Sequence, residues 1–144
     1  MLKSLRLVIA GAEKLNPQVV TDFKQKFGLD IYEGYGATET APVASVNVPD
    51  TIDSNVFFIQ KGNKSGTVGL PLPGSMFKIV DPVTIQPLPQ GEAGLILVGG
   101  TQVMQVYLDD QEKTQASLID QDGILWYKTG DKGQLDEDGF LSII

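Results

Sequence analysis

The chain has 144 residues, a formal charge of −7 at pH 7 and 42% hydrophobic residues, which is typical of a globular domain rather than a disordered chain. It contains no cysteine and no histidine, which excludes disulfides, thiolate nucleophiles, histidine-based catalytic triads and zinc sites built on those residues. The 11 basic residues form no stripe, so we expect no nucleic-acid partner.

The sequence contains no run of about 18 apolar residues, and we therefore expect no membrane span in this chain. The apolar run at residues 5–10 is too short for the core of a signal peptide. Together with the lack of cysteine, this predicts a cytoplasmic location, with association of a parent protein with the inner membrane left open.

The first part of the chain predicts a β-α-β unit. Residues 5–10 are a short apolar run, and Asn16-Pro17 is typical of a helix start, where the Asn side chain caps and Pro takes the first helical position. Gly28 stands where a helix ends in the left-handed conformation, and residues 29–32 return to a strand pattern. The crossover makes the two strands parallel. The apolar positions at helical spacing are Val19, Val20, Phe23 and Phe27.

After residue 40, short apolar runs alternate with Pro- and Gly-containing turns, which predicts a small antiparallel sheet or barrel. A helix is expected at residues 111–118, capped by Asp110, and Asp122-Gly123 and Asp138-Gly139 are typical of hairpin turns. The predicted class is therefore α/β (α+β), a β-α-β edge of a parallel sheet followed by a small antiparallel β-barrel-like subdomain. The expected strands are residues 43–48, 66–70, 76–80, 95–98, 104–108, 124–127 and 140–143.

This pattern divides the chain into residues 1–48, the edge of the sheet, residues 49–65, a loop or insertion, and residues 66–144, the barrel-like part. One β-α-β unit cannot cover a parallel sheet on both faces, and the last apolar run continues to Ile144. We therefore expect a piece of a larger protein. The exposed edge of its sheet predicts self-association.

Two glycine-bearing loops follow the two parallel strands, at residues 11–13 and 33–40. Ligands of such sheets bind beyond the carboxyl ends of the strands, and the crossover brings both loops to the same end. The second loop offers an aromatic ring in Tyr35, a hydroxyl in Thr38 and a carboxylate in Glu39. This set suits a nucleotide with Mg²⁺, and an ordinary tight turn is an equally good interpretation of the composition alone.

Five segments of the chain occur in the order GAEKL (11–15), EGYGATET (33–40), GTVGLPLPG (66–74), GEAGLILVGG (91–100) and WYKTGD (126–131). Together they resemble the adenylate-forming superfamily, which comprises acyl-CoA synthetases, acyl-carrier-protein synthetases, luciferases and peptide-synthetase adenylation domains. The longer phrases LRLVIAGAEKL and KFGLDIYEGYGATETAPVASVNVP are most similar to bacterial 2-acylglycerophosphoethanolamine acyltransferase/acyl–acyl-carrier-protein synthetases. The chain departs from the family pattern at Val106, Gln111 and Leu95, which the pattern places in turns away from the nucleotide.

The resemblance implies a role for each matching residue. Thr38 contacts the α-phosphate and Glu39 holds Mg²⁺, and these two carry the catalytic contribution of the chain. Asp131 binds the ribose hydroxyls, although from the residues alone it is an ordinary acid after Gly130. The residues implied to lie around the adenine of ATP or AMP are Gly11, Ala12, Glu13, Gly34, Tyr35 and Gly36.

The implied parent is a ligase that activates a fatty acid with ATP and Mg²⁺. It forms an acyl-adenylate and passes the acyl group to a thiol of acyl carrier protein or CoA. A long-chain acyl-CoA ligase and a non-catalytic β-rich interaction module are the alternatives. The family's phosphate loop and catalytic lysine match no segment between Met1 and Ile144, so we expect the chain by itself to be inactive.

Overall fold

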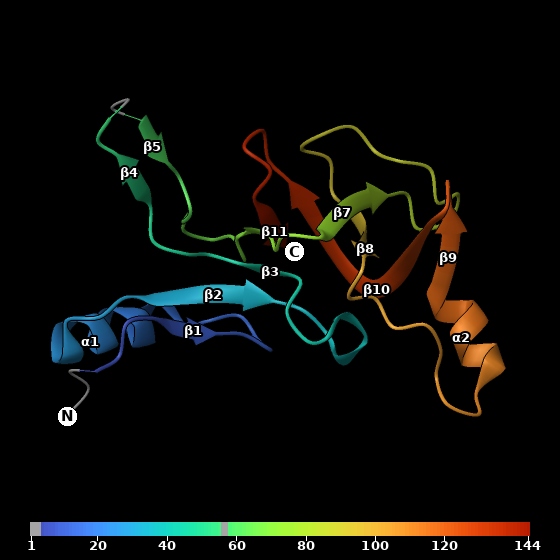
Figure 1. Cartoon of the computed structure of the whole chain (residues 1–144), viewed down its shortest axis with the longest axis horizontal. Coiled ribbons are helices and arrows are strands. Elements are labelled where there is room, and N and C mark those ends of the chain that lie inside the picture. The colour runs from blue at the N-terminus through green and yellow to red at the C-terminus, as the bar shows by residue number, and fades with distance from the viewer. Residues whose placement is uncertain (1–3, 56–57) are drawn as a thin grey trace.

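The computed structural model describes residues 4–55 and 58–144 of the chain. Within these residues the strands form a four-stranded sheet, a five-stranded sheet and a separate two-stranded hairpin, accompanied by few helices. Figure 1 shows the first sheet beside the N-terminal helix and the five-stranded sheet on the other side of the molecule. The predicted mixed class, with a parallel β-α-β edge followed by an antiparallel part, is confirmed.

The β-α-β unit consists of β1 (Val8–Ala10), α1 (Pro17–Phe27) and β2 (Ile31–Tyr35), and its two strands are parallel, with Ala10 opposite Glu33. The helix begins as predicted, because the Asn16 side chain accepts a 2.8 Å hydrogen bond from the Gln18 N–H. It ends at Gly28, whose φ of 69° is the left-handed conformation that glycine adopts without strain.

The first sheet continues in antiparallel fashion through β3 (Ser45–Val46) and β6 (Leu70–Pro71). The buried Asn47 follows β3, and its amide donates to the Thr67 carbonyl at 2.7 Å while its oxygen accepts from the Lys64 N–H at 3.0 Å. Because its backbone N–H also donates to the Glu33 carbonyl, Asn47 connects residues 64–67 to the centre of this sheet.

The second sheet has the order β11-β10-β8-β7, with β9 paired to β10. Its long central strand β10 carries an irregularity, since Lys128 pairs with Leu97 and Lys132 with Leu95, so that three residues of β10 face one residue of β8. Such a bulge bends a strand and redirects its side chains. The strands are β7 (Ser75–Val80), β8 (Gly94–Gly100), β9 (Leu118–Gln121), β10 (Ile124–Leu135) and β11 (Leu141–Ile143).

Alternation along β8 builds two apolar clusters on opposite faces of the second sheet. Ile96 and Val98 belong to the larger cluster, which includes Ala44 from the first sheet region, while Leu97 packs with Trp126 on the other face. All of these side chains are buried. The larger cluster therefore joins the two sheets and fixes the end of β2 against the second sheet.

Several details differ from the sequence-based expectations. The strand predicted at residues 66–70 is wrong except for Leu70, which begins β6, and the strand predicted at residues 43–48 is reduced to β3. Residues 104–108, predicted as a strand, have no regular secondary structure, because their backbone follows the turn after residue 40 instead of a sheet. Helix α2 (Gln111–Ser117) gives way to β9 one residue before its predicted end, since Tyr127 pairs with Leu118 across the two strands. Residues 49–65, expected as a loop or insertion, contain the hairpin of β4 (Thr51–Asp53) and β5 (Phe58–Gln60).

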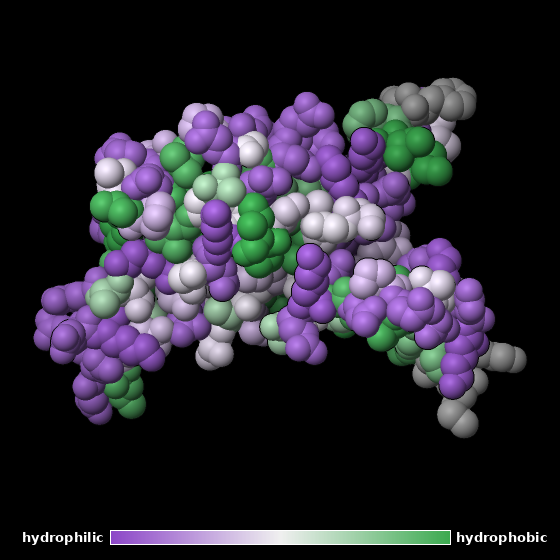
Figure 2. Space-filling view, turned by 180° about the vertical axis from the view of Figure 1, so that it is seen from behind, coloured by the Kyte–Doolittle hydropathy of each residue, from purple (hydrophilic) through white to green (hydrophobic). Residues whose placement is uncertain are grey.

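The β4–β5 hairpin extends away from both sheets (Figure 1). Its Ile52, Phe58 and Ile59 are all more than half exposed. Figure 2 shows these hydrophobic side chains standing out at one corner of the surface. No helix within residues 4–55 and 58–144 is long and apolar enough to cross a membrane.

Candidate functional site

Residues 11–13 follow β1 and lie beside the end of β2, while the first three residues of the second predicted loop (33–40) belong to β2 itself. A Cβ atom on Gly11 would lie 2.9 Å from the Gly34 carbonyl oxygen, so the loops approach more closely than any side chain at position 11 allows. Ala12 has a φ of 76°, and the Leu15 N–H donates to a Glu33 carboxylate oxygen at 3.4 Å. Gly11, Ala12 and Glu13 are exposed.

Tyr35, the last residue of β2, contacts Asp131 of β10 directly. Its hydroxyl donates a 2.6 Å hydrogen bond to Asp131 Oδ2, and its ring lies 6.5 Å from that of Phe77. Burial, followed by the hydrogen bond to Asp131, raises the pKa of Tyr35, so the hydroxyl keeps its proton and remains a donor. The structure therefore brings together Tyr35, one of the predicted adenine residues, and Asp131, the predicted ribose residue, which are far apart in the sequence.

The bulge in β10 is what presents Asp131 to Tyr35. Thr129 donates its hydroxyl proton to the Ile96 carbonyl at 2.9 Å and accepts the Asp131 N–H at 3.0 Å, while Gly130 adopts a φ of 83°. Asp131 itself is exposed. A carboxylate held at an exposed bulge is suited to accept two hydrogen bonds from a diol.

The turn after β2 is a short 3-10 helix, η1 (Thr38–Thr40), entered through Gly36. A Cβ atom on Gly36 would lie 1.9 Å from the Pro42 carbonyl oxygen, so only glycine permits this path. The buried Thr40 hydroxyl accepts the Ala37 N–H at 3.0 Å and closes the turn. This leaves the side chain of Thr38 exposed and that of Glu39 half-buried.

Glu39 has a partner that the sequence does not reveal. The hydroxyl of Tyr107 donates a 2.5 Å hydrogen bond to Glu39 Oε1, and the Glu39 carbonyl accepts the Met104 N–H at 2.9 Å. The hydrogen bond from Tyr107 lowers the pKa of Glu39, and the same contact raises the pKa of Tyr107. Burial first, and then the charge of Glu39, raises the pKa of the nearby Tyr127 to about 12.

The carboxylate of Glu39 fits Mg²⁺ only in company with a nucleotide. No group of three or more Asp, Glu, His or Cys side chains suited to a metal occurs within residues 4–55 and 58–144. Mg²⁺ commonly takes one or two protein carboxylates, completing its octahedron with phosphate oxygens and water. Tyr107 uses one lone pair of Oε1, so the Glu39 carboxylate keeps lone pairs for such an ion.

The structure thus joins Gly11 to Gly34 and Tyr35 to Asp131. Tyr107 and Thr129 are the positioning residues that the sequence patterns missed. Tyr107 lies in a segment whose apolar pattern predicted a strand, and Thr129 precedes a glycine that predicted only a turn. Trp126 and Tyr127, the first two residues of the WYKTGD segment, are buried and belong to the core.

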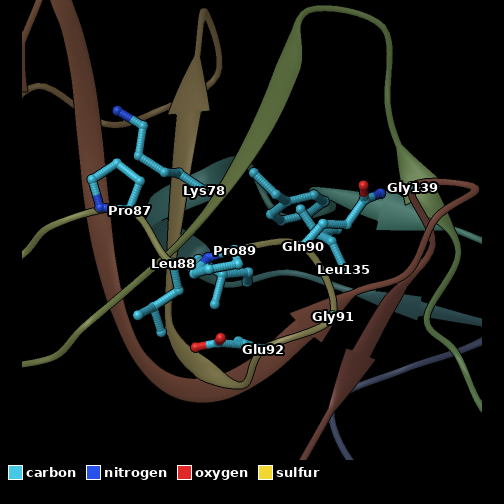
Figure 3. A pocket seen from close by; sticks show the side chains of 11 residues that line it. Lys78, Pro87, Leu88, Pro89, Gln90, Gly91, Glu92, Leu135 and Gly139 are labelled. Carbon is cyan, nitrogen blue, oxygen red and sulfur yellow. The ribbon is translucent and has the colours of Figure 1, made fainter.

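A separate cavity of about 290 Å³ opens beneath the segment that connects β7 to β8. Leu88, Leu135 and Phe77 form much of its wall, with Lys78 and Glu92 at its margin (Figure 3). None of the predicted site residues lines it. Its wall is largely apolar, and it is distinct from the Tyr35–Asp131 contact.

Comparison with known proteins shows the family of the chain. A profile of the family described as "AMP-binding enzyme" matches residues 1–108. The probable 4-coumarate–CoA ligase 2 of Dictyostelium discoideum is 39% identical over 145 residues, which cover 99% of this chain and 24% of the relative. The 4-coumarate–CoA ligase 2 of Nicotiana tabacum is 37% identical, with 99% and 25% covered.

Solved structures show the same similarity. Apo MatB from Rhodopseudomonas palustris aligns with a TM-score of 0.79 at 35% identity, covering 96% of this chain and 25% of MatB. An anthranilate CoA ligase in complex with anthranoyl-AMP aligns with a TM-score of 0.80 at 28% identity, covering 99% and 24%. The chain spans about a quarter of the length of these relatives. With the family profile matching well over half of its residues, this chain belongs to the AMP-binding enzyme family.

Proposed function

We propose that this chain contributes the adenosine-binding and metal-binding side of the active site in an ATP-dependent ligase that joins a carboxylic acid to a thiol. The observation that carries the proposal is the Tyr35–Asp131 contact, which places an aromatic ring and an exposed carboxylate together beside the turn that holds Glu39. The names of the relatives, which are CoA ligases, support the same reaction class.

In this proposal each side chain acts on one part of ATP. The adenine lies between the 11–13 loop and the ring of Tyr35, and Asp131 accepts hydrogen bonds from the two ribose hydroxyls. The Thr38 hydroxyl donates to an α-phosphate oxygen, and Glu39 holds Mg²⁺, which neutralises charge on the phosphates. Because Tyr35 already donates to Asp131, the ribose competes with this contact or shares the carboxylate with it.

The reaction proceeds in two steps. A carboxylate oxygen of the acid attacks the α-phosphorus, the bond to the β-phosphate oxygen breaks, and pyrophosphate leaves. A thiol sulfur then attacks the acyl carbon of the acyl-adenylate, loses its proton to solvent, and AMP leaves. We propose a fatty acid as the acid, which agrees with the similarity to a long-chain-fatty-acid-CoA ligase from Archaeoglobus fulgidus at a TM-score of 0.82, 25% identity and coverage of 97% and 28%.

CoA is the acceptor that the relatives' names support, while the resemblance of residues 5–15 to acyl-carrier-protein synthetases supports acyl carrier protein. Supplying the whole enzyme with labelled fatty acid, ATP and either acceptor distinguishes them. Thioester on CoA alone assigns an acyl-CoA ligase, and thioester on the carrier protein assigns an acyl-carrier-protein synthetase.

Substitution in the whole enzyme tests the proposal. Glu39→Gln is expected to reduce ATP–pyrophosphate exchange by about a hundredfold. Asp131→Asn is expected to reduce it by about tenfold or more. Both variants should keep their fold, as measured by circular dichroism. Glu137→Gln, a change of the same kind on an exposed turn, is the control and leaves exchange unchanged. Full activity of both site variants would contradict the proposal and favour the alternative of a non-catalytic β-rich interaction module.

The 144-residue chain alone is proposed to be inactive. Nucleotidyl transfer depends on cations placed around the reacting phosphates, and Lys128 and Lys132 match none of the family's catalytic positions. ATP–pyrophosphate exchange by the purified chain with a fatty acid would contradict this part of the proposal.

A further inference from the structure

Tyr107 holds the carboxylate of Glu39 through a contact that bridges 68 residues of sequence. The Tyr107 hydroxyl donates at 2.5 Å to Glu39 Oε1. The backbone of Glu39 is also bound to the same segment, because its carbonyl accepts the Met104 N–H at 2.9 Å. A third contact runs from the Gln102 side-chain amide to the Val43 carbonyl, also at 2.9 Å. Residues 102–107 therefore make three hydrogen bonds to residues 39–43, and one of them is to the Glu39 carboxylate itself.

Tyr107 is in turn fixed by the first turn of α2. The Thr114 hydroxyl accepts the Tyr107 N–H at 2.9 Å and donates to the Asp110 carbonyl at 2.8 Å. Asp110 caps the helix by accepting the Lys113 N–H, and the Lys113 ammonium lies 4.1 Å from the centre of the Tyr107 ring. Both the backbone and the ring of Tyr107 thus have a defined place before any ligand binds.

A carboxylate that is free to rotate offers either oxygen to a metal and loses rotational freedom on binding. The hydrogen bond to Oε1 holds the Glu39 carboxylate in one orientation, and its remaining lone pairs are left to accept a metal. Groups that hydrogen-bond a metal-ligating carboxylate orient it, and their loss typically lowers metal affinity by about tenfold to a hundredfold.

We infer that Tyr107 is a positioning residue that orients Glu39 for the metal of a metal–nucleotide complex, with Thr114 holding Tyr107 in place. This inference rests on the proposed function, because it assigns the metal to Glu39. It concerns binding rather than the chemical step, since Tyr107 reaches the site only through Glu39.

The test is the affinity of the 144-residue chain for the Mn²⁺–ATP complex, followed by the electron paramagnetic resonance signal of Mn²⁺ and compared with the same titration of Mn²⁺ and ATP without protein. Tyr107→Phe is expected to weaken Mn²⁺ binding about tenfold, and Glu39→Gln is expected to abolish it. Affinity for AMP without metal should be unchanged in Tyr107→Phe.

Two comparisons distinguish loss of the orientation of Glu39 from general destabilisation of the fold. One compares Tyr107→Phe with Tyr32→Phe, and the other compares Thr114→Val with Thr114→Ser. Tyr32→Phe removes the hydroxyl of another tyrosine and should leave Mn²⁺ binding unchanged. Thr114→Ser, which keeps the hydroxyl, should bind like the parent chain, while Thr114→Val should lose part of the affinity. Equal Mn²⁺ affinity in Tyr107→Phe and the unsubstituted 144-residue chain would overturn the role of Tyr107, and it would leave the assignment of the metal to Glu39 standing. Absence of metal–nucleotide binding in the folded parent chain would instead contradict the assignment of the metal to Glu39, and the inference with it.

Discussion

The hydroxyl of Tyr35 donates a 2.6 Å hydrogen bond to Asp131, a residue 96 positions away on a different sheet. Tyr35 ends a strand of the first sheet, and Asp131 lies in the bulge of β10 in the second. The contact therefore links the two halves of the molecule at the place where the nucleotide is proposed to bind.

Asp131→Asn is expected to weaken AMP binding by roughly tenfold to a hundredfold, because a neutral amide loses a charge-assisted hydrogen bond to the ribose. Tyr35→Phe keeps the ring and frees Asp131 from its internal donor, so AMP affinity should stay within about threefold of the parent value. Isothermal titration calorimetry on both variants measures this. Equal AMP affinity of Asp131→Asn and the parent chain would remove Asp131 from the site.

Gly36→Ala is expected to destabilise the chain by about 1–3 kcal/mol, because the added Cβ lies 1.9 Å from the Pro42 carbonyl oxygen and the turn must move. Gly91→Ala is the control, since it meets no atom within 4 Å and carries only the cost of a positive φ, about 1 kcal/mol. Urea unfolding measures both. A smaller loss at Gly36 than at Gly91 would show that the close approach is not required.

The ion pair of Lys64 with Asp136, at 2.6 Å, predicts a pH dependence of stability. Burial alone raises the pKa of Asp136, but the hydrogen bonds from Lys64 and the Phe140 N–H bring it below its ordinary value, while Asp136 and Asp138 raise the pKa of Lys64. The contribution of Asp136 is present above its unfolded pKa of about 3.9 and is lost as the pH falls through the lower folded pKa. The contribution of Lys64 is present below about pH 10 and is lost as the pH rises through its raised folded pKa.

Lys64→Met should therefore lower the urea midpoint at pH 7, and the difference from the parent chain should vanish at a pH low enough to protonate Asp136 in the fold. Lys61→Met is the matched control, because Lys61 Nζ lies 4.0 Å from Asp138, and its effect should be smaller. A difference that stays constant from pH 7 to pH 2 would contradict an electrostatic origin.

Strand β1 is at the edge of the first sheet and predicts self-association of the chain. Two hydrophobic side chains are exposed at this edge: Ile9, within β1, is 51% exposed and Leu7, just before it, is 40% exposed. Light scattering should give a mass that rises with concentration, and Leu7→Lys should lower it, whereas Ile52→Lys on the separate hairpin should not. A monomeric mass at the highest concentration would contradict the prediction.

The β-α-β unit was predictable because its signals are local. Asn16 and Gly28 mark the two ends of one helix, and each acts within a few residues. The Glu39–Tyr107 contact was not predictable, since it depends on how a segment without regular structure passes the turn after β2. Asp131 was assigned only through the resemblance, because the bulge that exposes it depends on pairing with β8.

Strand β9 was missed for a similar reason. The polar sequence after Asp110 continues a helical pattern to Leu118. Leu118 begins a strand instead because it pairs with Tyr127 of β10. The hairpin in residues 49–65 has a weak pattern because both of its strands are exposed, so no alternation of buried and exposed side chains marks them.

The central claim is that the Tyr35–Asp131 contact and the two glycine loops form one side of a nucleotide site, and an amide-shift titration of the 144-residue chain with AMP, and then with ATP and Mg²⁺, tests it most directly. The account predicts that the amides of residues 11–13, 34–39 and 131 shift together with a single dissociation constant, and that Mg²⁺ adds a further shift at Glu39 only when ATP is present. Unchanged amide chemical shifts at these residues in the folded chain, at nucleotide concentrations of several millimolar, would contradict the account.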